Sequence, residues 1–166
     1  MQIKRNVSRQ HSGSKNGAAN NSPLTREEMV VLLNEDLERE YQAIIAYVVY
    51  SQVIDGAAYK AIAEDLAVHA AEELQHALML SKQVVYLGGM PTVIPKPVKT
   101  SSNAQEMLHL DLENERVTIN HYRERICQAE SMGEYALSET LRKIIQQEQD
   151  HEIDLASALG IQAPTH

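Results

Sequence analysis

Apolar residues recur at helical spacing along most of the chain, and no run alternates apolar and polar residues as a β-strand does. The first helix is predicted to begin at a capping box formed by Thr25 and Glu28 and to end near Gly56. Its apolar positions include Leu33, Leu37, Ile44 and Val48. Three more helices are predicted, over about residues 57–87, 103–133 and 134–159. The pattern therefore indicates an all-α protein.

The connection between the second and third predicted helices sets the topology. It holds about 14 residues, among them Pro95 and Pro97, which favour an extended chain. Such a segment spans about 46 Å at roughly 3.3 Å per residue, whereas a helix of about 25–30 residues measures about 40 Å. The other two connections are short. The sequence therefore predicts a four-helix bundle, made of two antiparallel helix hairpins joined by a long crossover.

Each predicted helix carries an apolar stripe that polar side chains interrupt only near its middle. The interrupting side chains repeat along the chain at a fixed offset of 75 residues. The first set is Glu40, Tyr47, Glu73 and His76, and the second is Glu115, Tyr122, Glu148 and His151. We therefore predict two related hairpins that pack about a pseudo-two-fold axis and bring the two polar sets face to face.

Four glutamates at core positions require a compensating charge. Isolated buried carboxylates cost many kcal/mol or take up protons, whereas two divalent cations would balance them. A glutamate and a histidine three residues apart share one face of a helix, so Glu73 and His76 can bind one ion while Glu148 and His151 bind the other. The remaining two glutamates would supply terminal or bridging oxygens. Mixed carboxylate and imidazole ligands favour iron or manganese.

A set of partly exposed glutamates and histidines that solvates the bundle surface is the alternative interpretation of this band. It does not explain why these residues occupy positions that otherwise hold leucine. His69, one turn before Glu73, is expected to be a hydrogen-bonded core histidine, with a role as an extra or transient ligand as the alternative. Tyr47 and Tyr122 are expected to hydrogen-bond ligand carboxylates, or otherwise to pack in the core.

Two further predictions concern residues beside the apolar stripe. Three acidic residues are expected to form a solvated face rather than to guide cations inward: Asp36, Glu72 and Asp111. Cys127, the single cysteine, is expected to pack inertly beside the stripe.

Composition and charge narrow the class of protein. The chain has 166 residues and a net charge of −8. Residues 1–22 hold four basic and no acidic residues, whereas the rest holds 11 basic and 23 acidic residues. We expect a flexible basic arm over 1–22 and an acidic bundle over 23–166, which favours cations over nucleic acid as partners. One cysteine excludes a disulfide framework and predicts a cytoplasmic location. The chain has no stretch of 18 apolar residues, so no membrane span is expected.

Residues 30–158 resemble the bacterioferritin branch of the ferritin-like superfamily. The resemblance rests on the segment from Leu33 to Tyr47, on Glu73-Leu-Gln-His76 with the later Leu-Gly-Gly-Met-Pro, and on Glu148-Gln-Asp-His151-Glu-Ile-Asp. It implies a ferroxidase that oxidises Fe(II) with O2 or H2O2 and deposits ferric mineral in a hollow homo-oligomeric shell. It also implies two iron ions per subunit, with Tyr47 beside them. The implied ligands are Glu40, Glu73, His76, Glu115, Glu148 and His151.

Two departures from the family pattern matter. Leu74 stands where the family has its haem-ligating methionine, so no haem is expected. Only a short segment follows His151, so a shell of 12 subunits competes with one of 24. A di-iron or di-manganese peroxidase or catalase without storage is the alternative function. A non-enzymatic helical or DNA-coating protein is the third, although solubilising or shell contacts suit the arm better than DNA.

Overall fold

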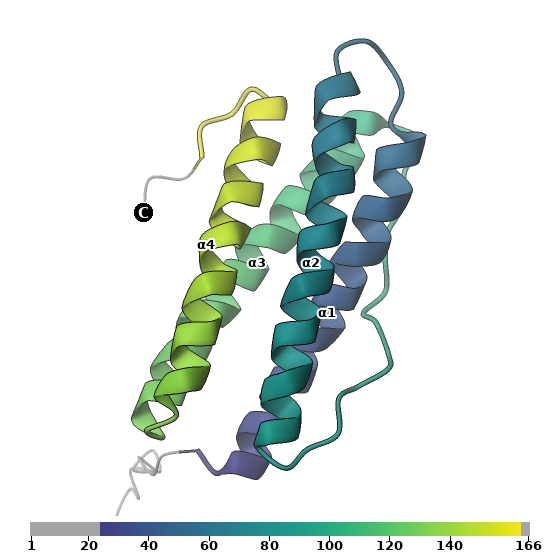
Figure 1. Ribbon diagram of the computed structural model, residues 1–166. Coiled ribbons are helices and arrows are strands. Elements are labelled where there is room, and N and C mark those ends of the chain that lie inside the picture. The colour runs from purple at the N-terminus through teal and green to yellow at the C-terminus, as the bar shows by residue number, and fades with distance from the viewer. Residues whose placement is uncertain (1–23, 164–166) are drawn as a thin grey trace, which may run out of the picture.

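The computed structural model describes residues 24–163, and these residues fold into four helices (Figure 1). The helices are α1 (Arg26–Val53), α2 (Lys60–Tyr86), α3 (Ala104–Ser131) and α4 (Tyr135–Ala158). The all-α prediction is confirmed, since no strand occurs in this part of the chain. The predicted arm, residues 1–22, lies outside the described residues. None of the helices within 24–163 is long and apolar enough to span a membrane.

Local side-chain chemistry fixes where the helices begin. The Thr25 hydroxyl accepts from the Glu28 N–H at 3.2 Å, and the Glu28 carboxylate accepts from the Thr25 N–H at 2.8 Å. This confirms the predicted capping box. Asn103 caps α3 by accepting from the Glu106 N–H at 3.0 Å. The predicted start of the second helix is wrong by three residues, because a turn at Gly56, with φ of 114°, precedes it.

The crossover joins the two hairpins along the whole bundle. In Figure 1 it leaves the end of α2 and runs beside α1 to the opposite end of the molecule, where α3 begins. The Lys96 N–H donates to the Glu38 carbonyl at 3.0 Å, and the Gln42 side chain donates to the Pro97 carbonyl at 2.6 Å. A Cβ at Gly89 would lie 2.4 Å from a methyl carbon of Val30, so only glycine allows this approach to α1.

Two apolar clusters fill the ends of the bundle. One includes Leu33, Leu80 and Leu141, and the other includes Leu66 and Leu108. The predicted polar band lies between them along each helix. One predicted core position is wrong: Val48 is 51% exposed, because the neighbouring Tyr47 and Tyr50 turn inward instead. The fold thus places a belt of polar side chains between two layers of hydrocarbon.

Candidate metal centre

All six predicted ligands meet at the middle of the bundle, and each is at most 3% exposed. Every helix contributes at least one of them, because the apolar stripe of each helix faces the axis of the bundle. The residues are Glu40 from α1, Glu73 and His76 from α2, Glu115 from α3, and Glu148 and His151 from α4. The two helix hairpins therefore supply three ligands each.

Glu73 and Glu148 each face both histidines. Glu73 places one oxygen 3.0 Å from His76 Nδ1 and the other 2.9 Å from His151 Nδ1. Glu148 does the same, at 3.1 Å from His76 Nδ1 and 3.8 Å from His151 Nδ1. Two carboxylates placed in this way could each contact both members of a pair of cations, and each histidine could contact one of them.

Two overlapping groups of potential ligand atoms follow from this arrangement. Within each group the ligand atoms lie within 4.8 Å of one another. The groups are Glu40, Glu73, His76 and Glu148, and Glu73, Glu115, Glu148 and His151. Glu40 and Glu115 each belong to one group, whereas Glu73 and Glu148 belong to both.

The polar atoms at the centre of the bundle are incompletely hydrogen-bonded and could bind metal ions. One oxygen of Glu115 is buried without a hydrogen-bond partner in residues 24–163, and the corresponding oxygens of Glu40, Glu73 and Glu148 lie 3.4, 2.9 and 3.1 Å from histidine nitrogens. Buried polar atoms in folded proteins are normally paired. A cavity of about 10 Å³, roughly the room that one water molecule needs, borders all four carboxylates. Carboxylate and imidazole donors with this geometry suit iron or manganese.

Burial has the largest effect on the pKa values of Glu40 and Glu115. It raises the pKa of Glu40 and Glu115 well above the ordinary value, and the negative charges of Glu148 and Glu73 raise it further. Without cations, burial therefore favours the protonated form of both carboxyl groups.

The two histidines also hold protons in the absence of cations. Burial opposes this, but contact with the Glu73 carboxylate raises the pKa of His151 to about 9. Carboxylates raise the pKa of His76 still further, with Glu148 and Glu40 contributing most. Burial acts to raise the pKa of Glu73, yet contacts with His151 and His76 bring it below the ordinary value. Cation binding must therefore release protons from this site.

Stabilisation by a divalent cation should grow with pH. A group whose pKa is raised by folding stabilises the fold most below its unfolded-state pKa, which is about 4.5 for the carboxyl groups and about 6.5 for the imidazoles. This stability is lost as the pH rises from there to the folded-state pKa. The lowered pKa of Glu73 changes stability only at acidic pH, because the stability that this group contributes is lost as the pH falls below about 4.5. Between pH 6 and 8 the metal-free protein should therefore lose stability, while cations bind more tightly.

The size of this effect is about 1.4 kcal/mol per pH unit for each proton released. The measurement is the melting temperature with and without Mn²⁺, at roughly pH 6 and pH 8. We expect the larger shift at the higher pH. An equal shift at both would show that the ion binds at groups that hold no protons.

Two tyrosines hydrogen-bond Glu40 and Glu115 across the bundle. The Tyr47 hydroxyl of α1 donates to Glu115 of α3, and the Tyr122 hydroxyl of α3 donates to Glu40 of α1. The predicted hydrogen bonds are therefore present, and they are reciprocal between the hairpins. Burial raises the pKa of both phenols well above the usual range, so they stay neutral and donate. Each fixes one oxygen and leaves the other free.

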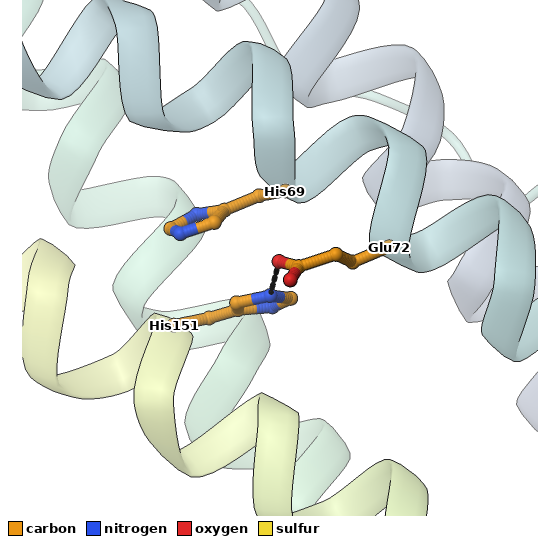
Figure 2. A group of neighbouring side chains, drawn as sticks. All are labelled: His69, Glu72 and His151. Carbon is orange, nitrogen blue, oxygen red and sulfur yellow. Dashed lines mark hydrogen bonds and ion pairs between the residues drawn. The ribbon is translucent and has the colours of Figure 1, made fainter.

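The outer nitrogens of His76 and His151 also contact polar side chains. His76 Nε2 lies 3.0 Å from the Gln147 side-chain oxygen, and His151 Nε2 lies 2.9 Å from the Glu72 carboxylate. Such contacts orient an imidazole so that its other nitrogen faces the cation. Glu72 is half-buried and reaches solvent, as predicted for an acidic face, but it also contacts His151 at the edge of the site (Figure 2), which was not predicted.

Three further residues differ from their predicted surroundings. Asp36 and Asp111 are 2% and 3% exposed rather than solvated. Asp36 forms an ion pair with Arg125, which sequence reasoning missed; the signal was an arginine one turn beyond the core position of Tyr122. Cys127 is exposed rather than packed, because the inward turn of α3 is occupied by Arg125 and its neighbour Ile126.

Comparisons with known proteins agree with this geometry. The protein-family model for the ferritin-like domain matches residues 30–162. A ferritin-like, diiron-carboxylate protein from Bacillus anthracis str. Ames is 33% identical, with a TM-score of 0.78 over 81% of this chain and 96% of that chain. The bacterioferritin-related protein from Bacteroides fragilis, a dodecameric thioferritin, is 25% identical, with a TM-score of 0.77 over 82% and 87%. A bacterioferritin from Brucella melitensis is 23% identical over 135 residues, which cover 77% of this chain and 84% of that protein.

Proposed function

Because the chain belongs to the ferritin-like family, as a bacterioferritin-like member, we propose that it oxidises Fe(II) at a dinuclear centre and stores the ferric product. The observation that carries this proposal is the pair of buried carboxylates, Glu73 and Glu148, each of which faces both ligand histidines. The relatives support iron as the metal, and the mixed ligand set accommodates it.

The reaction needs two electrons and a place where two ions meet. Two Fe(II) ions are the substrate, and each gives up one electron. Together the electrons reduce O2 to H2O2, or H2O2 to two water molecules, with two protons taken up. The protein binds both ions in one fixed geometry that excludes bulk water. Glu40 and Glu115 supply negative charge once their protons leave, and the two tyrosines keep these carboxylates in position.

Storage requires a closed shell of many subunits, and we propose a homo-oligomer of 12 or 24. The Bacteroides fragilis relative is described as dodecameric, which supports the smaller shell. We also propose that the chain binds no haem at position 74, because Leu74 offers no ligand atom and lies 49% exposed on α2. DNA binding through residues 1–22 forms no part of this proposal.

Aerobic loading with a large excess of Fe(II) tests the storage function. We expect iron far above about two ions per chain in the protein peak from size exclusion, and a peak much larger than a dimer. About two ions per chain in a small oligomer would instead indicate a dinuclear peroxidase or catalase. Retention of no iron would contradict the metal centre itself.

A further inference from the structure

A groove of about 310 Å³ lies between α1, α3 and the crossover, on the side of the bundle away from α2 and α4 (Figure 1). This volume is at the lower end of the range that is typical of small-molecule sites, about 300–1,000 Å³. The crossover forms one wall, and α1 holds it in place. Gln42 donates to the Pro97 carbonyl, and the Tyr50 hydroxyl donates to the Lys99 carbonyl. The walls of the groove are therefore fixed by the fold.

The charges around this groove are mainly positive. Arg39, Lys96 and Lys99 line it, whereas Glu113 is the one acidic lining residue in the part of the chain that the structure describes. This excess is unusual in a protein with a net charge of −8. Both lysines come from the crossover, which holds no acidic residue. A concave surface with an excess of one charge concentrates ions of the opposite charge, so the groove favours anions.

Two of the three cations have no fixed counter-charge. Nε of Arg39 is buried without a hydrogen-bond partner among the described residues, and its Nη2 lies 3.0 Å from His121 Nε2. Burial and the charge of Arg39 lower the pKa of His121, so this ring is neutral at pH 7. Lys99 is exposed, and within residues 24–163 neither it nor Arg39 forms an ion pair with a carboxylate. Both side chains therefore keep their charge available for an anion.

The opposite side of the bundle has the contrasting charge. A cavity between α2 and α4 is lined by four carboxylates and, among the described residues, by no lysine or arginine. His69 also lines it and is buried, with Nε2 3.3 Å from the Asp154 carboxylate, as expected of a hydrogen-bonded core histidine. An anion therefore meets less repulsion at the groove between α1 and α3 than on this acidic side.

The groove adjoins the proposed dinuclear centre. Arg39, Gln42 and Asn114 line both the groove and the small cavity that borders the four ligand carboxylates. A negatively charged centre behind the groove would repel an anion. Two bound divalent cations, however, would balance the four glutamates, so the centre does not cancel the positive charge of the groove.

We propose that the groove binds one small oxyanion, inorganic phosphate, between Arg39 and Lys99. A guanidinium offers a planar fork of N–H donors that matches two phosphate oxygens, and an ammonium adds a further charged donor. Lys96 contributes less, because it already pairs with Glu38 at 3.3 Å. The site adds an anion-binding function to the chain, and it does not depend on iron oxidation.

The test is calorimetric titration of inorganic phosphate into the metal-free, full-length protein at low ionic strength. We expect about one phosphate per chain in the wild type. Arg39→Gln and Lys99→Gln each remove a charged donor and should weaken binding by at least about tenfold. Arg39→Lys keeps the charge but loses the fork, so it should weaken binding less than Arg39→Gln does. Lys143→Gln removes an exposed lysine that does not line the groove, and should leave the affinity unchanged.

Three outcomes would overturn the anion site. The wild type would bind no phosphate, the groove variants would bind it as tightly as the wild type does, or Lys143→Gln would lose as much affinity as they do. The second outcome would place the phosphate elsewhere, and the third would show a response to net charge alone. Lys99→Gln decides the matter if circular dichroism shows that Arg39→Gln has lost helix content, because Lys99 holds Tyr50 through its carbonyl and not its side chain. No iron is present, so none of these results bears on the dinuclear centre.

Discussion

Replacing Glu73 by alanine should slow Fe(II) oxidation by more than about a hundredfold. Loss of an outer partner of a metal ligand typically costs roughly 10–100-fold. Glu73 is closer to the chemistry than such a partner, because its two oxygens face the two ligand histidines at 3.0 Å and 2.9 Å. The variant therefore removes an oxygen from both cations and leaves their charge less balanced. The measurement is the initial rate of ferric absorbance after anaerobic protein with Fe(II) is mixed with oxidant.

A matched variant separates loss of the site from loss of a helix. Glu64→Ala removes an exposed glutamate from the same helix, α2, and should oxidise iron at the native rate. Circular dichroism should show equal helix content in both variants, because alanine is a strong helix former. If Glu73→Ala oxidised iron as fast as Glu64→Ala, the assignment of the dinuclear centre would be wrong.

The sequence was sufficient to predict the helices and the composition of the polar band. Helical periodicity is a strong signal, and charged residues at core positions stand out against it. The offset of 75 residues then related the two halves, and the structure brings Glu40, Glu73, Glu115 and Glu148 together as that offset implies. Periodicity is less reliable at the edges of an apolar stripe, which explains why Val48 is exposed and Tyr50 buried.

Partners across the bundle could not be predicted, because they depend on how the hairpins dock. Asp36 and Asp111 occupy related positions in the sequence, yet within residues 24–163 only Asp36 has an arginine partner; the offset places Tyr50 where the second arginine would be. The sequence left Glu40 and Glu115 as terminal or bridging ligands, since that choice depends on side-chain directions. The role of Glu72 was missed for the same reason, because its contact with His151 spans two helices.

Replacing Arg125 by methionine should lower the free energy of unfolding by about 3–5 kcal/mol, the usual cost of leaving one member of a buried ion pair alone. Arg125 and Asp36 are each 2% exposed. The guanidinium donates twice to the carboxylate, at 2.7 Å and 3.1 Å, and once to Gln128 at 2.6 Å. The pair links α1 to α3, whereas most helix contacts lie within a hairpin. Loss of the arginine leaves the buried Asp36 carboxylate without its ion-pair partner.

The melting temperature of the metal-free protein, at one fixed protein concentration, measures this effect, because bound ions and subunit association would mask it. At about 2–4 °C per kcal/mol, the expected decrease is roughly 6–20 °C. Arg142→Met breaks an exposed ion pair with Glu130 and should cost less than about 1 kcal/mol.

Removing the second member of the buried pair provides the decisive comparison. The double variant Asp36→Leu with Arg125→Met fills the same space with apolar atoms, and should recover most of the lost stability. Recovery would show that the single variant is destabilised by an unpaired buried charge rather than by a packing defect. If the double variant were less stable than either single variant, the pair would act mainly through shape, and its substitution by hydrocarbon would misalign α1 and α3. Because those helices carry Glu40 and Glu115, iron binding would then weaken along with stability.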